Sequence, residues 1–160
     1  MPRTARVDVG DYVYHVLNRA NGRLQIFGSS NEYLQFEQLL IEMKEITGMR
    51  ILAYTLMPNH WHLALYPQND GNLREFMHLL TNSHTRKVHA QTGTNGSGHL
   101  YQGRYKSFLV DSDNYLLTLI KYIERNPVRA NLISRPEDWK WGSAWLRTNG
   151  SGEQKQKKLL

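Results

Sequence analysis

The chain has 160 residues and no cysteine, and it carries 20 lysine and arginine residues against 14 aspartate and glutamate residues. This length favours one domain with a core of its own. The missing cysteines exclude disulfides and thiolate-bound zinc, and they fit a cytoplasmic protein. We expect no secretory leader behind Met1 and no membrane partner, because no apolar run is long enough to span a bilayer. The formal net charge of +6 favours an anionic partner such as nucleic acid, although half of the excess lies toward the C-terminus.

Seven segments have the periodicity of regular secondary structure, with period two in strands and spacings of three and four in helices. In chain order they are a strand at 12–17, a helix from about 32 to 47, strands at 50–57 and 60–66, a helix from 72 to about 91, a strand at 104–110 and a helix from 114 to about 126. The serines at 29 and 30 or Asn31 should cap the first helix, and Gly48 should end it. Pro127 should end the last helix.

The order is therefore β-α-β-β-α-β followed by one more helix. Its first six elements match the split βαβ pattern of the ferredoxin-like fold. The predicted class is α+β, with an antiparallel sheet and a C-terminal helix that carries Tyr122. We predict a single domain over residues 1–145 and a polar, basic tail over 146–160. Flexibility is expected for the tail and for the glycine-rich loop at 93–98.

Two histidines open the strand predicted at 60–66. His60 and His62 are two residues apart, and strand side chains with this spacing point to the same face of a sheet. Their imidazoles could therefore hold one divalent ion together, while Trp61 points to the opposite face. The motif is short, so a pair of strand histidines that make ordinary hydrogen bonds is the alternative.

The last predicted helix carries a second pair of candidate residues. Tyr122 and Asn126 are four residues apart, so they should lie on one helix face. The amide oxygen of Asn126 could be a third metal ligand, and the phenol of Tyr122 could attack a phosphorus atom held by that metal. Tyr115 is a rival nucleophile, but a helix would separate it from Asn126 by about 16 Å. A core aromatic residue and a helix-terminating asparagine are the alternative roles.

Basic residues are expected on or near this helix and on the strand before it. Arginine suits bidentate contacts with phosphate. We expect most of these residues to be solvated and one or two to contact the phosphates of a nucleic acid. The candidates are Arg104, Lys106, Lys121, Arg125 and Arg129.

Several motifs occur together in one order between about residues 3 and 145. They are Tyr14-His15-Val16 with Asn18-Arg19 and Asn21-Gly22-Arg23, then Leu56-Met57-Pro58-Asn59-His60-Trp61-His62-Leu63, then His99-Leu100-Tyr101-Gln102-Gly103-Arg104-Tyr105-Lys106, then 111–113, and finally Tyr122-Ile123-Glu124-Arg125-Asn126-Pro127-Val128-Arg129-Ala130. This set resembles the single-tyrosine HUH transposases, and most closely the REP-associated tyrosine transposases. In the trailing Trp-Ser-Ser segment at 139–145, Gly142 stands in the place of the family's first serine.

The resemblance implies a metal site of His60, His62 and Asn126, with Tyr122 as the nucleophile. It also implies a divalent ion, magnesium or manganese, and single-stranded DNA with hairpins formed by repetitive extragenic palindromes. The expected activity is single-strand cleavage and strand transfer through a 5′-phosphotyrosine intermediate, by a monomer or a homodimer. Two alternatives stay open: a DNA- or RNA-binding module without chemistry, and a metallohydrolase that uses water. The second is disfavoured because the other histidines form no second His-x-His pair.

Overall fold

A computed structural model of the chain describes residues 6–22, 24–93, 98–111, 113–149 and 158–160. Its first seven elements follow the predicted order of strands and helices. The elements are β1 (Val13–Arg19), α1 (Ser30–Thr47), β2 (Arg50–Met57), β3 (His60–Tyr66), α2 (Asn72–Thr92), β4 (Lys106–Val110), α3 (Asp113–Glu124), α4 (Asn126–Arg129), η1 (Pro136–Asp138) and α5 (Ser143–Thr148). None of the helices within these described ranges is long and apolar enough to cross a membrane.

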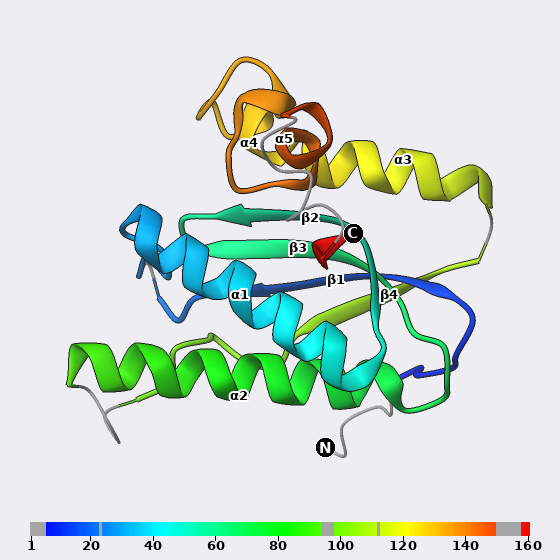
Figure 1. Cartoon of the computed structure of the whole chain (residues 1–160), viewed down its shortest axis with the longest axis horizontal. Coiled ribbons are helices and arrows are strands. Elements are labelled where there is room, and N and C mark those ends of the chain that lie inside the picture. The colour runs from blue at the N-terminus through cyan, green and yellow to red at the C-terminus, as the bar shows by residue number, and fades with distance from the viewer. Residues whose placement is uncertain (1–5, 23, 94–97, 112, 150–157) are drawn as a thin grey trace.

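One four-stranded sheet organises the molecule, with strand order β2-β3-β1-β4 and antiparallel pairing between all neighbours. The predicted α+β class with a ferredoxin-like core is therefore confirmed. Helices α1 and α2 cover one face of the sheet, α3 and α4 lie on the opposite side, and α5 lies at the edge formed by β2 (Figure 1). The sheet thus has one face for each group of helices.

The main hydrophobic core fills the space between the sheet and the pair α1 and α2. Trp61 is fully buried there, among residues such as Phe36 and Val16. Because side chains alternate along a strand, burying Trp61 on this face turns His60 and His62 toward α3. The core therefore decides which way the two histidines point.

The end of the last predicted helix differs from the expectation. Helix α3 ends at Glu124, and Asn126 begins the separate four-residue helix α4, in which Pro127 lies in the first turn. A proline has no N–H to donate, so it is accepted at the start of a helix as readily as it ends one. Asn126 consequently lies beyond a break in the helix rather than one turn along a continuous helix.

The C-terminal segment covers the outer edge of β2. The backbone N–H of Leu56 donates to the carbonyl of Trp141, and the indole N–H of Trp139 donates to the carbonyl of Leu56. Helix α5 continues to Thr148, past the predicted start of the tail, and Leu146 is fully buried. Leu159 is buried as well. Residues 150–157 of the predicted tail and 94–97 of the predicted loop lie outside the described residues.

A buried chain of hydrogen bonds runs from Trp61 to α2. The indole N–H of Trp61 donates to the hydroxyl of Tyr101 at 3.0 Å. Nδ1 of His84 lies 2.5 Å from the same buried oxygen and is the acceptor that satisfies its O–H. Burial lowers the pKa of His84 to about 3. The network therefore needs a neutral His84.

We expect His84 to make the fold sensitive to acid. Its pKa is lower in the folded than in the unfolded chain, so between pH 6.5 and 3 the unfolded chain binds the extra proton. The free energy of unfolding therefore decreases as the pH is lowered. One such group adds about 1.4 kcal/mol per pH unit to this slope. His84→Asn, which keeps an acceptor for Tyr101, should flatten the slope of unfolding free energy measured in urea between pH 6 and 4. The exposed His78→Asn on the same helix is the control, and an unchanged slope in His84→Asn would contradict this account.

Candidate active site

The sheet face under α3 gathers three of the candidate residues. The ring centres of His60 and His62 are 5.2 Å apart, and the planes of the two rings are nearly perpendicular. From α3, Tyr122 places its ring centre 6.0 Å from that of His62. Residues that are 60 positions apart in sequence therefore form one cluster on the surface of the sheet.

Both histidines of β3 are largely buried, and burial sets their protonation. It lowers the pKa of His60 to about 4 and that of His62 to about 3. The charge of Arg19, which pairs with His60 across β1 and β3, lowers both pKa values further. At neutral pH each imidazole is uncharged, and so each has a nitrogen lone pair to offer.

The hydrogen bond of His60 indicates which nitrogen carries that lone pair. Nδ1 of His60 lies 2.7 Å from the side-chain oxygen of Asn59, which can only accept, so Nδ1 carries the proton and Nε2 of the neutral ring carries the lone pair. A hydrogen bond with the side chain of Asn126 acts in the opposite direction and raises the pKa of His60. Asn126 therefore lies within hydrogen-bond distance of His60.

These residues fit a divalent ion held by two imidazoles and one amide oxygen. In the described part of the chain, no group of three or more His, Cys, Asp or Glu residues could hold a metal, so a site here needs Asn126. The amide nitrogen of Asn126 is buried and has no hydrogen-bond partner among the described residues. Because this nitrogen is a donor and cannot bind a cation, the ligand from Asn126 would be its amide oxygen.

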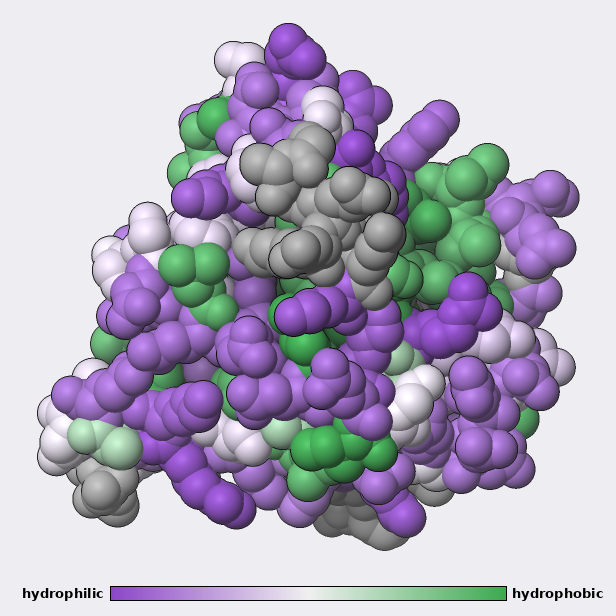
Figure 2. Space-filling model, in the orientation of Figure 1, coloured by the Kyte–Doolittle hydropathy of each residue, from purple (hydrophilic) through white to green (hydrophobic). Residues whose placement is uncertain are grey.

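Tyr122 lies at the edge of an open, mostly apolar cleft of about 500 Å³ between α3 and β4. The Tyr122 side chain is 41% exposed, and the guanidinium carbon of Arg129 lies 4.6 Å from its ring centre. Tyr115 and Phe108 also line the cleft. Exposed hydrophobic side chains gather over α3 in Figure 2, and Leu117 on this helix is 68% exposed. The cleft is therefore open to a ligand beside the phenol.

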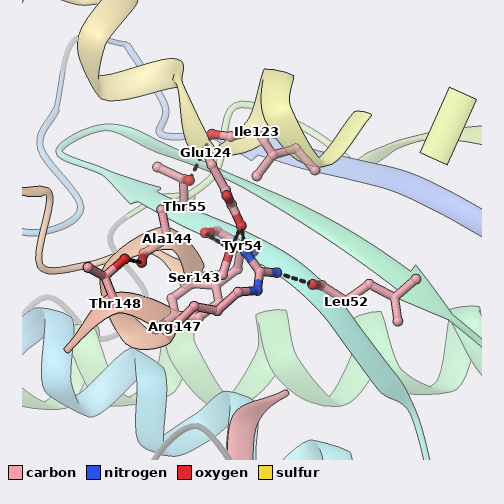
Figure 3. Close-up of polar contacts among 9 residues, drawn as sticks. All are labelled: Leu52, Tyr54, Thr55, Ile123, Glu124, Ser143, Ala144, Arg147 and Thr148. Atoms are coloured by element: carbon pink, nitrogen blue, oxygen red, sulfur yellow. Dashed lines mark hydrogen bonds and ion pairs between the residues drawn. The ribbon is translucent and has the colours of Figure 1, made fainter. Parts of the chain in front are cut away.

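Polar contacts tie the C-terminal end of α3 to β2 and α5 (Figure 3). The hydroxyl of Thr55 donates to the carbonyl of Ile123 at 2.8 Å, and that of Ser143 donates to the Glu124 carboxylate at 2.7 Å. Arg147 forms an ion pair with the same carboxylate. We call these five residues the α3 clamp. The clamp holds the end of α3 that follows Tyr122 against β2 and α5.

The five basic candidates do not form one group. Arg129 lies against Tyr122, and Lys106 pairs with Leu17 of β1, which itself pairs with His62, so Lys106 extends this row across the sheet. Arg104 precedes β4 and lines a different cleft, of about 670 Å³, together with Arg6 and Arg74. The remaining two candidates, Lys121 and Arg125, are exposed at the end of α3.

Three residues of the site were not identified from the sequence as functional. His15 of β1 places Nε2 2.9 Å from Nδ1 of His62, and its ring stacks on that of His62. Arg19 and Asn59 contact the site as described above. All three belong to the motifs at 14–19 and 56–63, which supplied a signal but no role for these side chains.

Comparison with known families assigns the chain to a family. The family of IS200-like transposases matches residues 8–126. The chain belongs to this family. The sequence motifs of a single-tyrosine HUH transposase thus have independent support, and the role of the protein is that of a transposase. No curated protein sequence matches the chain.

Two solved structures share the fold of this transposase. A REP-associated tyrosine transposase bound to a REP hairpin has a TM-score of 0.68 and 19% identity, and the match covers 89% of this chain and 82% of the other. A putative transposase from Deinococcus radiodurans R1 has a TM-score of 0.51 and 20% identity, with 78% and 97% of the two chains covered. At these identities the similarity shows the fold alone.

The α3 clamp should contribute measurably to stability through Ser143. Its hydroxyl is buried, accepts the backbone N–H of Tyr54 and donates to Glu124. Ser143→Ala leaves both partners short of a hydrogen bond, so we expect a loss of about 1–3 kcal/mol in the free energy of unfolding, measured in urea. Thr148→Ala, an exposed hydroxyl on the same helix, should change it by less than about 0.5 kcal/mol. Equal losses in the two variants would contradict this role.

Proposed function

We propose that this transposase is a metal-dependent endonuclease and strand transferase that acts on single-stranded DNA carrying a hairpin. The observation that carries the proposal is the 6.0 Å approach of the Tyr122 ring to the His62 ring in a member of the IS200-like family. A phenol, two neutral imidazoles and a carboxamide are suitable groups for binding and attacking a phosphodiester. A solved protein of the same fold binds a REP hairpin, which supports hairpin DNA as the substrate class.

In this proposal His60, His62 and Asn126 would hold a magnesium or manganese ion. Such an ion would polarise the scissile phosphate and neutralise the charge that develops on it. Asn59 fixes the orientation of His60, and burial keeps both imidazoles neutral, as metal ligation requires. In this proposal the ligand side chains are therefore preorganised before the ion and the DNA bind.

Tyr122 is the proposed nucleophile. Its oxygen attacks the scissile phosphorus, which forms a 5′-phosphotyrosine bond and breaks the bond to the leaving 3′-oxygen, so that a 3′-hydroxyl is released. The phenolic proton leaves as the bond to phosphorus forms, and the guanidinium of Arg129 lies over the ring at this point. A 3′-hydroxyl from another strand can then attack the phosphotyrosine and reseal the DNA without ATP.

Unpaired DNA next to the scissile phosphate would find two kinds of contact. Arg129 and Lys106 lie beside the site, and Lys121 and Arg125 are exposed at the end of α3; these four residues could bind phosphates, and Arg104 could do so from the other cleft. Aromatic rings such as Tyr115 and Phe108 give bases a surface to stack on, which suits single strands. The cleft therefore favours a single strand near Tyr122.

Tyr122→Phe tests the nucleophile. The variant keeps the ring and loses the oxygen, so we expect it to form no covalent adduct with hairpin-bearing single-stranded DNA in Mn²⁺, as judged by denaturing gel electrophoresis. Tyr115→Phe, on the same helix and in the same cleft, should form the adduct at a wild-type rate within about three-fold. An adduct in Tyr122→Phe would rule out this assignment, and the absence of any adduct from the wild type would favour a binding module without chemistry.

His60→Ala and His62→Ala test the metal site. Each variant removes one of the few proposed ligands, so the affinity of the DNA-free protein for Mn²⁺ and the rate of cleavage should each fall by about 100-fold or more. Isothermal titration calorimetry measures the first quantity and adduct formation the second. His78→Ala, an exposed histidine of α2, is the control. Wild-type cleavage by either β3 variant would refute metal binding by these residues.

A further inference from the structure

A third histidine, His15 of β1, lies beside the two histidines of β3. Nε2 of His15 lies 2.9 Å from Nδ1 of His62, and the ring centres are 5.2 Å apart with an interplanar angle of 22°. The same His15 ring lies 5.8 Å from the Tyr122 ring, which contacts it edge-on. His15 therefore touches both the proposed ligand His62 and the proposed nucleophile.

The register of the sheet explains how His15 reaches His62. In the pairing of β1 with β3, Leu17 lies opposite His62, and His15 lies opposite Ala64. His15 and His62 are thus diagonal neighbours on one face, a distance that long or aromatic side chains can bridge. The small side chain of Ala64 leaves room for the His15 ring to lean toward His62. On the other side, the ring of Phe108 lies 6.0 Å from that of His15.

The contact restricts the protonation of His62. A neutral imidazole carries one N–H, and the two facing nitrogens can share only one proton between them. If His62 donates from Nδ1, its Nε2 keeps a lone pair. If His15 donates from Nε2 instead, His62 must carry its proton on Nε2 and has no lone pair left for a metal.

We propose that His15 is a positioning residue, which accepts the Nδ1–H of His62 and so leaves Nε2 of His62 free for the metal. This deepens the proposed function, since it rests on His62 as a ligand. His62 thereby gains from His15 what His60 gains from Asn59, an acceptor at Nδ1 that fixes the tautomer and the ring. The ring of His15 also packs edge-on against Tyr122, so one side chain contacts both the ligand and the nucleophile.

The tautomer of His62 can be measured without metal or DNA. We expect ring-nitrogen NMR of the wild-type protein, labelled with ¹⁵N-histidine, to show His62 protonated on Nδ1 and unprotonated on Nε2 near pH 7.5. In His15→Leu this preference should be lost, because the tautomer of a histidine follows the partner of its other nitrogen. A wild-type His62 that carries its proton on Nε2 would overturn the proposal, and this measurement needs no variant to fold.

Metal affinity supplies a second, independent readout. Removing a partner of this kind lowers metal affinity by about 10- to 100-fold, so His15→Leu should weaken Mn²⁺ binding to the DNA-free protein by this factor. His15→Gln places an amide oxygen where Nε2 lies and should stay within about three-fold of the wild type. Val13→Ala is the matched control, because Val13 lies on the same face of β1 without contacting His62. An unchanged affinity in His15→Leu would refute the role of His15.

The two proposals fail in different ways. If the wild-type protein and His60→Ala show no difference in Mn²⁺ affinity, the metal site of the proposed function is wrong, whereas the tautomer of His62 is still decided by NMR. If His60→Ala loses Mn²⁺ binding while His15→Leu and His15→Gln both retain it, the metal site stands and the inference about His15 is wrong.

Discussion

The burial of Trp61 is the interaction on which the site depends. A strand places successive side chains on opposite faces, so the residues on either side of a fully buried tryptophan must face the other way. The hydrogen bond from Trp61 to Tyr101, and from there to His84, fixes the indole in the core. A slip of one residue in β3 would bury both histidines and expose the tryptophan, so a change of register would strongly destabilise the fold.

Different interactions hold the helices on the two faces of the sheet. Large side chains fill the space beneath α1 and α2, whereas Ile123 is the one buried residue of α3, and it packs on Ala53 and Ala64. Little apolar area therefore holds α3, and the α3 clamp supplies the rest through hydrogen bonds and an ion pair. Such a face leaves room for a ligand that a tightly packed core would exclude.

Much of the fold could be predicted because its signals are local. The ranges of β2 and β3 and the limits of α1 follow from alternation, helical spacing and the capping residues Ser29 and Gly48. The short helices α4 and α5 have too few residues to show a period, so they and the break between Glu124 and Asn126 were missed. The approach of Tyr122 to His62 could still be predicted, because it needs only that the helix carrying Tyr122 lies over the sheet face that carries His62.

The contact of His15 with His62 could not be predicted in the same way. It depends on the register between β1 and β3 and on the small size of Ala64, and neither is visible in one strand alone. The same holds for Arg104, which the linear order places beside Lys106 but which the turn before β4 directs into the cleft with Arg6 and Arg74. A sequence motif can show which residues are functional, but it does not show which other side chains they contact in the fold.

The position of the α3 clamp has a consequence for motion of the helix. Its contacts with α3 all involve the last two residues of the helix, next to Tyr122, while the other end carries the exposed Tyr115 and Leu117. A tilt of α3 about the clamped end would sweep Tyr115 through a wide arc and displace the phenol of Tyr122 only slightly. The cleft could thus widen or narrow around strands of different shape while the distance from Tyr122 to the histidines stays nearly constant.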